Sequence, residues 1–290
     1  MKIRFIITVA FLISAVFTGL AYSIDADPFL VKVPNGSINW TSGIITATGS
    51  GKPAENEVAN SPDLEAKIFS AAMENAGQNL FEIVKKIRIN SIKRVENLFF
   101  GDSDILIKAR EMVYATREVE KKRKTGPDGV LEVHLRFQFY GGFAQLVLPQ
   151  EIKQVESITK VLSGKKVPSE GPAQEIFSGL VVDARGIGAR PAMAPMILDE
   201  NGQVVYGAAF VSREYAIQNG MSGYVTDIGA AERETRIGYY PLTVKGLKTE
   251  GPGRCDIVIS NSDSAKLRKS SDNLLFLKEC RVVIVLDAES

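Results

Sequence analysis

The sequence predicts an α+β protein, in which a small antiparallel sheet with a long packed helix is followed by a mixed α/β second domain. Apolar residues recur at steps of three and four from Leu64 to Ile87, which is the period of an amphipathic helix. Residues 131–139 alternate between apolar and polar, as in a half-buried antiparallel strand. Residues 282–286 are uninterrupted aliphatic residues, which is typical of a strand buried on both faces.

Composition limits the classes of function. The chain has 290 residues, which suggests about two domains, and its 45% hydrophobic and 24% charged residues are ordinary for a globular protein. Its 35 basic and 34 acidic residues nearly balance, so we expect no nucleic-acid partner. A single His and two Cys exclude a zinc finger and a three-His centre, and we expect no metal and no cofactor.

Residues 1–23 have the pattern of a secretory signal peptide. Lys2 and Arg4 precede an apolar run at 5–17, and the small residues Ala21 and Ser23 suit cleavage after Ser23. The run is shorter than the roughly 20 apolar residues of a membrane span. Because no Cys lies near the cut, the sequence predicts an exported chain without a lipid anchor, either periplasmic or associated with the outer membrane.

Residues 24–150 form the first predicted domain, a β-α-β-β unit. Ser61 is placed to cap a helix whose first residue is Pro62. The small residues Ala72 and Ala76 in its middle let that helix approach a sheet closely. In chain order the predicted elements are an extended lead-in at 24–34, a strand at 39–48, a helix at 61–87, a helix from Asp102 or Ser103, and strands at 113–122 and 131–139. The charged strand at 113–122 suits a sheet edge.

Residues 151–175 are interpreted as a linker with a short helix, and residues 176–290 as the second domain. Asn201-Gly202 predicts a hairpin turn, because both residues tolerate positive φ. Ser212 and Gly220 have the residue types that begin and end a helix. The remaining predictions are strands at 179–184, 196–199, 203–206, 242–247, 256–259 and 281–287, the last of them central in its sheet, and partly helical structure at 264–279.

Cys255 and Cys280 are the only cysteines. Export would place them in an oxidising compartment, where a disulfide is allowed. Whether their Cα atoms lie within bonding reach is not determined by spacing, so the bonded and the free states both remain open.

The loop after the strand at 179–184 is the best candidate for a binding site. Asp183 ends the strand, and a glycine-rich turn follows that carries Arg185 and Arg190. The turn does not match a dinucleotide fingerprint, because Pro191 occupies the third glycine position. Arg185 and Arg190 could hold a carboxylate or a phosphate. The alternative is that Asp183 pairs with an arginine and braces the turn.

The sequence contains no constellation of catalytic residues. His134, the only His, lies on the polar face of a predicted strand, which favours a structural position over a catalytic base. Asp199 and Glu200 offer oxygen ligands for calcium, but the hairpin explains them and the spacing of an EF-hand is absent. Cationic residues gather near the end of the long helix, where they suit anionic lipid as well as the helix dipole: Lys85, Lys86, Arg88, Lys93 and Arg94.

Two segments carry a resemblance to known families. The helix at 66–89, the charged strand and the strand at 131–139 with Gly141-Gly142 resemble the twenty-kilodalton bacterial outer-membrane lipoproteins and the N-terminal domain of flagellar assembly protein T. Residues 178–186 and 195–207 resemble the second domain of exported proteins that carry such a first domain. The resemblance implies an envelope location and a role in assembly or scaffolding, and it supplies no catalytic residues. The chain lacks the acylated Cys of the lipoproteins.

Three hypotheses follow. The first is an exported, non-enzymatic scaffold or interaction protein of the cell envelope, whose partners are envelope proteins, a second copy of itself, or the outer-membrane surface. The second is an anion-binding module that uses Asp183, Arg185 and Arg190. The third is a carboxylate-based hydrolase that uses Asp183 and a second acid.

Overall fold

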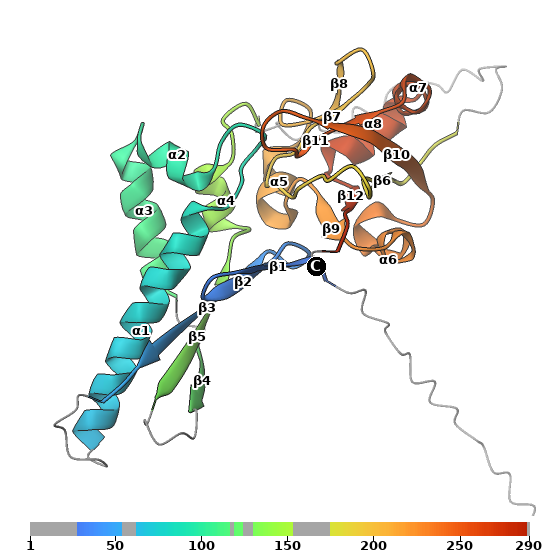
Figure 1. Ribbon diagram of the computed structural model, residues 1–290. Helices are drawn as coiled ribbons and strands as arrows, with labels where there is room; N and C mark the ends of the chain where they lie inside the picture. The colour runs from blue at the N-terminus through green and yellow to red at the C-terminus, as the bar shows by residue number, and fades with distance from the viewer. Residues whose placement is uncertain (1–27, 54–61, 117–118, 124–129, 153–174, 289–290) are drawn as a thin grey trace, which may run out of the picture.

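The computed structural model describes residues 28–53, 62–116, 119–123, 130–152 and 175–288 (Figure 1). They form two units, and the predicted fold class is confirmed. A five-stranded antiparallel sheet packs on one long helix in the first unit, and a seven-stranded mixed sheet with helices forms the second. The predicted signal peptide at 1–23 and nearly all of the predicted linker, residues 153–174, lie outside the described residues.

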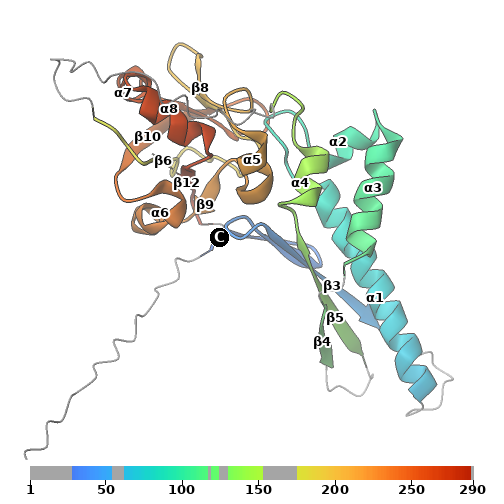
Figure 2. The same ribbon diagram turned by 180° about the vertical axis from the view of Figure 1, so that it is seen from behind.

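The first unit is a sheet of order β1-β2-β3-β5-β4 with α1 packed along it (Figure 2). The charged strand β4 takes one edge of this sheet, as predicted. The elements are β1 (Leu30–Val33), β2 (Gly36–Asn39), β3 (Ile44–Gly51), α1 (Pro62–Lys85), α2 (Val95–Phe99), α3 (Ser103–Tyr114), β4 (Val119–Arg123), β5 (Leu131–Gln138) and α4 (Gly142–Val147).

Helix α1 lies unusually close to β3, as its small residues predicted. Gly49 of β3 faces Ala72 and Ala76, and a Cβ built on Gly49 would lie 2.1 Å from the backbone nitrogen of Ala76. A Cβ built on Gly51 would lie 2.2 Å from the carbonyl oxygen of Ile68. Glycine on the strand and alanine on the helix therefore allow backbone to pack against backbone.

Two expectations for the first unit were wrong. The predicted single strand at 39–48 is divided, because the chain turns at residues 40–43 between β2 and β3, and three strands precede α1 where β-α-β-β has one. Asn35-Gly36, with Asn35 at φ 60°, lies at the turn of the hairpin between β1 and β2, which the prediction of an extended lead-in at 24–34 missed. The strand predicted at 113–122 begins only at Val119, because Val113 is buried together with Ala109 on one face of α3.

The second unit has the strand order β8-β7-β11-β10-β6-β12-β9. Strands β9, β12, β6 and β10 are parallel, and β11 is antiparallel to β10. The elements are β6 (Gly179–Asp183), β7 (Ile197–Leu198), β8 (Val204–Tyr206), α5 (Arg213–Asn219), β9 (Gly223–Val225), α6 (Ile228–Arg233), η1 (Thr235–Ile237), β10 (Pro241–Glu250), β11 (Asp256–Ile259), α7 (Asn261–Arg268), α8 (Ser271–Lys278) and β12 (Val282–Val285).

Strand β12 is buried on both faces, as predicted, and is an interior strand between β6 and β9. Val283 and Val285 pack toward α6, whereas Val282 and Ile284 join the main core. The hairpin at Asn201-Gly202 is confirmed, with Gly202 at φ 74°. Gly220 ends α5 as expected, but Ser212 at its start makes no side-chain capping bond.

The two units share one continuous hydrophobic core. Trp40 of the first unit packs edge-on against Tyr224 of β9, and the amide of Gly141 donates to the carbonyl of Ile217 at 2.7 Å. On another side of the junction, the amides of Met193 and Ala194 donate to the carbonyls of Arg88 and Ile89 at 3.0 and 2.7 Å. Backbone hydrogen bonds thus fix the loop after β6 onto the segment that follows α1.

Within the described residues, no helix combines the length and the apolar character that crossing a bilayer requires.

Candidate functional site

Asp183 and Arg185, two of the predicted site residues, form an ion pair at the carboxyl end of β6. The Nε atom of Arg185 donates to Oδ1 of Asp183 at 2.8 Å. Lys245, opposite Asp183 on the parallel strand β10, donates from Nζ to Oδ2 at 3.1 Å. Both carboxylate oxygens are therefore occupied, and the geometry matches the alternative in which Asp183 braces the turn.

This pairing makes a prediction about acid stability. The hydrogen bond from Arg185, with help from Lys245, lowers the pKa of Asp183 from 3.8 to about 2. Because the pKa is lower in the folded chain than in the unfolded chain, the ionised carboxylate stabilises the fold fully above about pH 4. The contribution is lost as the pH falls toward 2. We expect it to be about 1 to 2 kcal/mol, since Arg185 and Lys245 are partly exposed and screened.

Urea unfolding of the wild type and of Asp183→Asn between about pH 6 and pH 3 measures this contribution. The wild type should be the more stable protein at the upper end, and the difference should shrink as the solution is acidified. Parallel pH profiles for the two proteins would contradict the assignment.

Arg190, the third predicted residue, lies in different surroundings. At the start of the loop that follows β6, the amide of Gly186 donates to both carboxylate oxygens of Asp287, at 3.1 and 2.9 Å. Further along the same loop, the amide of Arg190 donates to the carbonyl of Arg254 at 2.8 Å. The structure thus joins Asp183 and Arg185 but places Arg190 beside the turn between β10 and β11.

Arg190 belongs to a group of four arginines at the junction of the two units, which we call the arginine cluster: Arg88, Arg94, Arg190 and Arg254. The backbones of Arg88 and Arg94 form an isolated antiparallel bridge in the segment between α1 and α2. Arg88 Nη1 lies 2.7 Å from the position that a Cβ on Gly253 would take, next to Arg254. Four arginines that are distant in sequence therefore share one region of the surface.

Two glycines, Gly253 beside Arg88 and Gly188 beside Arg254, make room for these guanidinium groups. A Cβ on Gly188 would lie 2.0 Å from Nη2 of Arg254, which itself donates to the carbonyl of Ile187 at 3.3 Å. Gly188 also has φ 62°, a conformation that favours glycine. The second glycine of the rejected nucleotide fingerprint thus has another role: it lets the Arg254 side chain cross the loop.

Arg254 itself has a left-handed backbone, with φ 56°. An L-residue with a Cβ occupies this region at a cost of roughly 1 kcal/mol relative to glycine. Non-glycine residues in such conformations cluster at functional sites. The Arg254 side chain occupies this position at the tip of the β10–β11 turn and reaches the carbonyl of Ile187.

The cluster carries unneutralised positive charge. Among the residues that the structure describes, the ion pairs involve other cations, and none joins a carboxylate to any of the four arginines. Burial, followed by the charge of Arg94 and with a further contribution from Arg190, lowers the pKa of Arg88. The charges of Arg94 and Arg190 are thus unfavourable to that of Arg88, and guanidinium groups without a carboxylate partner suit the binding of an anion.

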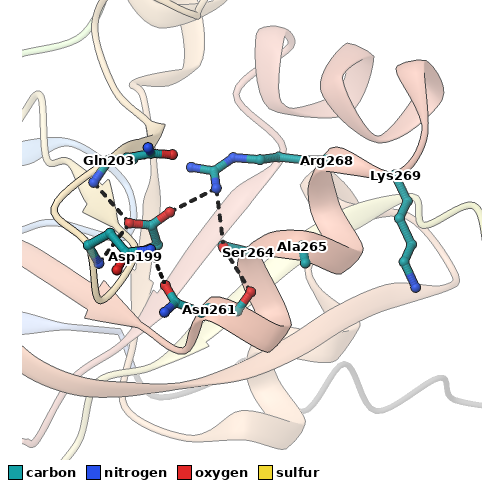
Figure 3. Close-up of a pocket in the computed structure, with 8 residues that line it drawn as sticks. Asp199, Gln203, Asn261, Ser264, Ala265, Arg268 and Lys269 are labelled. Atoms are coloured by element: carbon teal, nitrogen blue, oxygen red, sulfur yellow. Dashed lines mark hydrogen bonds and ion pairs between the residues drawn. The ribbon is translucent and has the colours of Figure 1, made fainter.

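A second polar site lies between the β7–β8 hairpin and α7 (Figure 3). Asp199 is only 2% exposed, and its Oδ1 accepts the amides of Asn201 and Gln203 at 3.0 and 2.9 Å. Its Oδ2 accepts Nη1 of Arg268 at 2.8 Å, and this bond lowers the pKa of Asp199. The open cavity beside this pair measures about 390 Å³. The hairpin interpretation of Asp199 is therefore sufficient, and the aspartate's charge is already balanced.

A disulfide between Cys255 and Cys280 is absent, and both residues are free and buried. They precede β11 and β12, which run in opposite directions and are separated by β10 and β6. Three strand spacings of roughly 4.8 Å already exceed the ~7 Å limit on Cα separation. Burial raises the pKa of Cys255 to about 12 and that of Cys280 to about 11, which suits inert core thiols.

His134 lies on β5 as expected, although it is half-buried, and its Nδ1 is 3.0 Å from the hydroxyl of Thr48 on β3. The described part of the chain holds no group of three or more His, Cys, Asp or Glu side chains arranged to bind a metal.

Sequence reasoning missed Arg254 and Lys245. It grouped Arg88 and Arg94 with the cations near the end of the long helix, which suit anionic lipid or the helix dipole, and did not connect them with Arg190. A usable signal for Arg254 was its place after Gly251-Pro252-Gly253, a turn segment between two predicted strands. No local signal could pair Lys245 with Asp183, because their contact depends on strand order.

The comparisons with known proteins concern the second unit. Residues 179–288, from β6 to the end of the described chain, match the family model of the second domain of Treponema pallidum Tp0624. No curated protein matches the chain.

Proposed function

We propose that this protein is an exported, non-enzymatic component of the cell envelope that acts as an interaction or scaffold protein. We further propose that the arginine cluster is the surface through which it binds. The observation that carries the proposal is the cluster itself, because unpaired cations on a well-braced surface suit binding of an anionic partner and do not form a catalytic constellation.

The junction between the units suits such a role. Each unit contributes two arginines, Arg88 and Arg94 from the first and Arg190 and Arg254 from the second. The bonds from Met193 and Ala194 to Arg88 and Ile89 hold the two contributions in register. Such a binding surface exists only when both units are folded and packed against each other. This suits a scaffold protein whose two units bind a partner together.

The signal-peptide pattern at 1–23 supports export, and the resemblance of the first unit to envelope lipoproteins and to the flagellar assembly domain supports the setting. The same resemblance leaves envelope proteins, a flagellar assembly and a second copy of the chain as partner classes. Peripheral contact with the outer membrane is a further class.

Anion binding, the second hypothesis, is favoured by the position of Arg190 but not by that of Arg185. Asp183 already balances Arg185, whereas Arg190 lies with three other arginines. We therefore transfer the anion-binding role from the Asp183 end of the loop to its Arg190 end. The hydrolase hypothesis is less favoured, because both carboxylate oxygens of Asp183 are already held by Arg185 and Lys245.

The test is crosslinking in whole cells, followed by cell fractionation and identification of the captured proteins. The wild type is compared with Arg190→Glu/Arg254→Glu and with a control of equal charge change, Lys32→Glu/Lys108→Glu, at two exposed positions away from the cluster. We expect envelope components to be captured by the wild type and the control, and lost with the cluster variant. Retention in the cytoplasm, or identical captures by all three proteins, would overturn the proposal.

A further inference from the structure

An exposed apolar side chain lies on the turn that connects two members of the arginine cluster, Arg88 and Arg94. Ile92 is 78% exposed, and it is part of the turn at residues 90–93 that connects Arg88 to Arg94. The side-chain oxygen of Asn90 accepts the amides of both Ile92 and Lys93, at 3.0 and 2.8 Å. The turn is therefore held in one shape, with an isoleucine and a lysine pointing to solvent.

The neighbouring residue fastens this turn to the second unit. Ser91 is buried, and its hydroxyl donates to the carbonyl of Glu250 at 3.2 Å. A Cβ on Gly253 would lie 2.6 Å from the carbonyl oxygen of Ser91, so the turn rests directly on the β10–β11 turn that carries Arg254. Figure 1 shows the segment between α1 and α2 running beside the turn that leads from β10 into β11, far from β4.

This combination has a chemical meaning. A phosphate in free solution needs only the guanidinium groups, which bind its oxygens in pairs. A bilayer surface also offers an apolar layer just below its phosphates, where an isoleucine is stabilised while cations remain with the headgroups. The exposed Ile92 beside Lys93 and the arginines therefore favours a membrane surface over a free anion.

We propose that the turn at residues 90–93 and the arginine cluster bind the surface of a bilayer that contains anionic phospholipid. The guanidinium groups contact headgroup phosphates, and Ile92 enters the interface. This inference rests on the proposed function, since it names the anionic partner that the cluster meets in the envelope. Membrane association through this surface would need no acylated Cys.

The test is co-sedimentation of the purified full chain with vesicles of phosphatidylcholine, with and without an equal share of phosphatidylglycerol. We expect strong binding only to the mixed vesicles, weakened by salt. Arg190→Gln/Arg254→Gln should weaken it about 25-fold, roughly fivefold for each guanidinium near an anionic surface. Arg190→Lys/Arg254→Lys should retain most of the binding, and a native melting temperature in each variant shows that folding is intact.

Ile92→Ser separates the two sources of phosphate, with Ile107→Ser, at a position 53% exposed on α3, as its matched control. Ile92→Ser should weaken vesicle binding several-fold and leave any thermal stabilisation by inorganic phosphate unchanged. Stabilisation by inorganic phosphate together with no effect of Ile92→Ser would overturn the membrane assignment and leave a free-phosphate site.

Equal binding to both kinds of vesicle, or no effect of the glutamine variants, would also overturn the inference. If the cluster variant still loses its captured proteins in cells but the wild type does not bind vesicles, only the lipid inference fails. If the cluster variants change neither measurement, the proposed function fails as well.

Discussion

Replacing Trp40 with alanine is expected to lower the free energy of unfolding by about 3 to 5 kcal/mol. The Trp40 side chain is 3% exposed, and its ring centroid lies 5.3 Å from that of Phe139 and 5.8 Å from that of Tyr224. Because Phe139 belongs to the first unit and Tyr224 to the second, the cavity would open at the junction. We therefore expect both units to be destabilised together.

Urea unfolding followed by far-UV circular dichroism measures the effect. In the wild type, the fluorescence of Trp40, the only tryptophan, should change at the same urea concentration as the dichroism. Trp40→Phe keeps an aromatic ring and should lose clearly less stability. Two separate transitions, of which the mutation shifts only one, would show that the units unfold independently.

Replacing Gly49 with alanine is expected to cost about 3 kcal/mol, at the upper end of the range for overpacking a core. The added methyl group would lie 2.1 Å from the amide nitrogen of Ala76 and 2.4 Å from the carbonyl oxygen of Ala72. Both are backbone atoms of α1, so no side chain can move aside and the helix itself must be displaced from β3.

Gly101→Ala is the matched control, because the nearest atom to its added methyl group would be 4.0 Å away and its φ is not positive. Thermal or urea unfolding of the two variants and of the wild type measures the difference in stability. The Gly101 variant should remain close to the wild type. Equal stability of Gly49→Ala and Gly101→Ala would mean that α1 is not held against β3 as described.

Elements with strong local patterns were predicted well. The helix α1 and the strands β5 and β12 each show their burial period over eight or more residues or as an unbroken aliphatic run, and the structure buries the expected faces. Chain turns inside β-rich sequence were predicted less well. The segment at 39–48 has strand composition throughout, and only the antiparallel pairing of β2 with β3 shows that the chain reverses within it.

The candidate site was predicted in part. The three predicted residues lie close together in the sequence. In the structure Asp183 pairs with Arg185, whereas the amide of Arg190 bonds to the carbonyl of Arg254. Lys245 completes the ion pair from a strand 62 residues away, since β10 lies beside β6. A glycine-rich loop with arginines was thus a correct signal for charge, and the residues that share that charge were not predictable from spacing.

Local interactions explain what the sequence alone determined: the fold class, the amphipathic helix, the buried last strand and the hairpin at Asn201-Gly202. Each depends on residues within a few positions of one another, so its pattern is written along the chain. The tertiary structure alone decided that Cys255 and Cys280 lie too far apart to bond and that Arg88, Arg94, Arg190 and Arg254 meet. Strand order and the docking of the two units bring such residues together or separate them, and those contacts arise from burial of the shared core rather than from any local pattern.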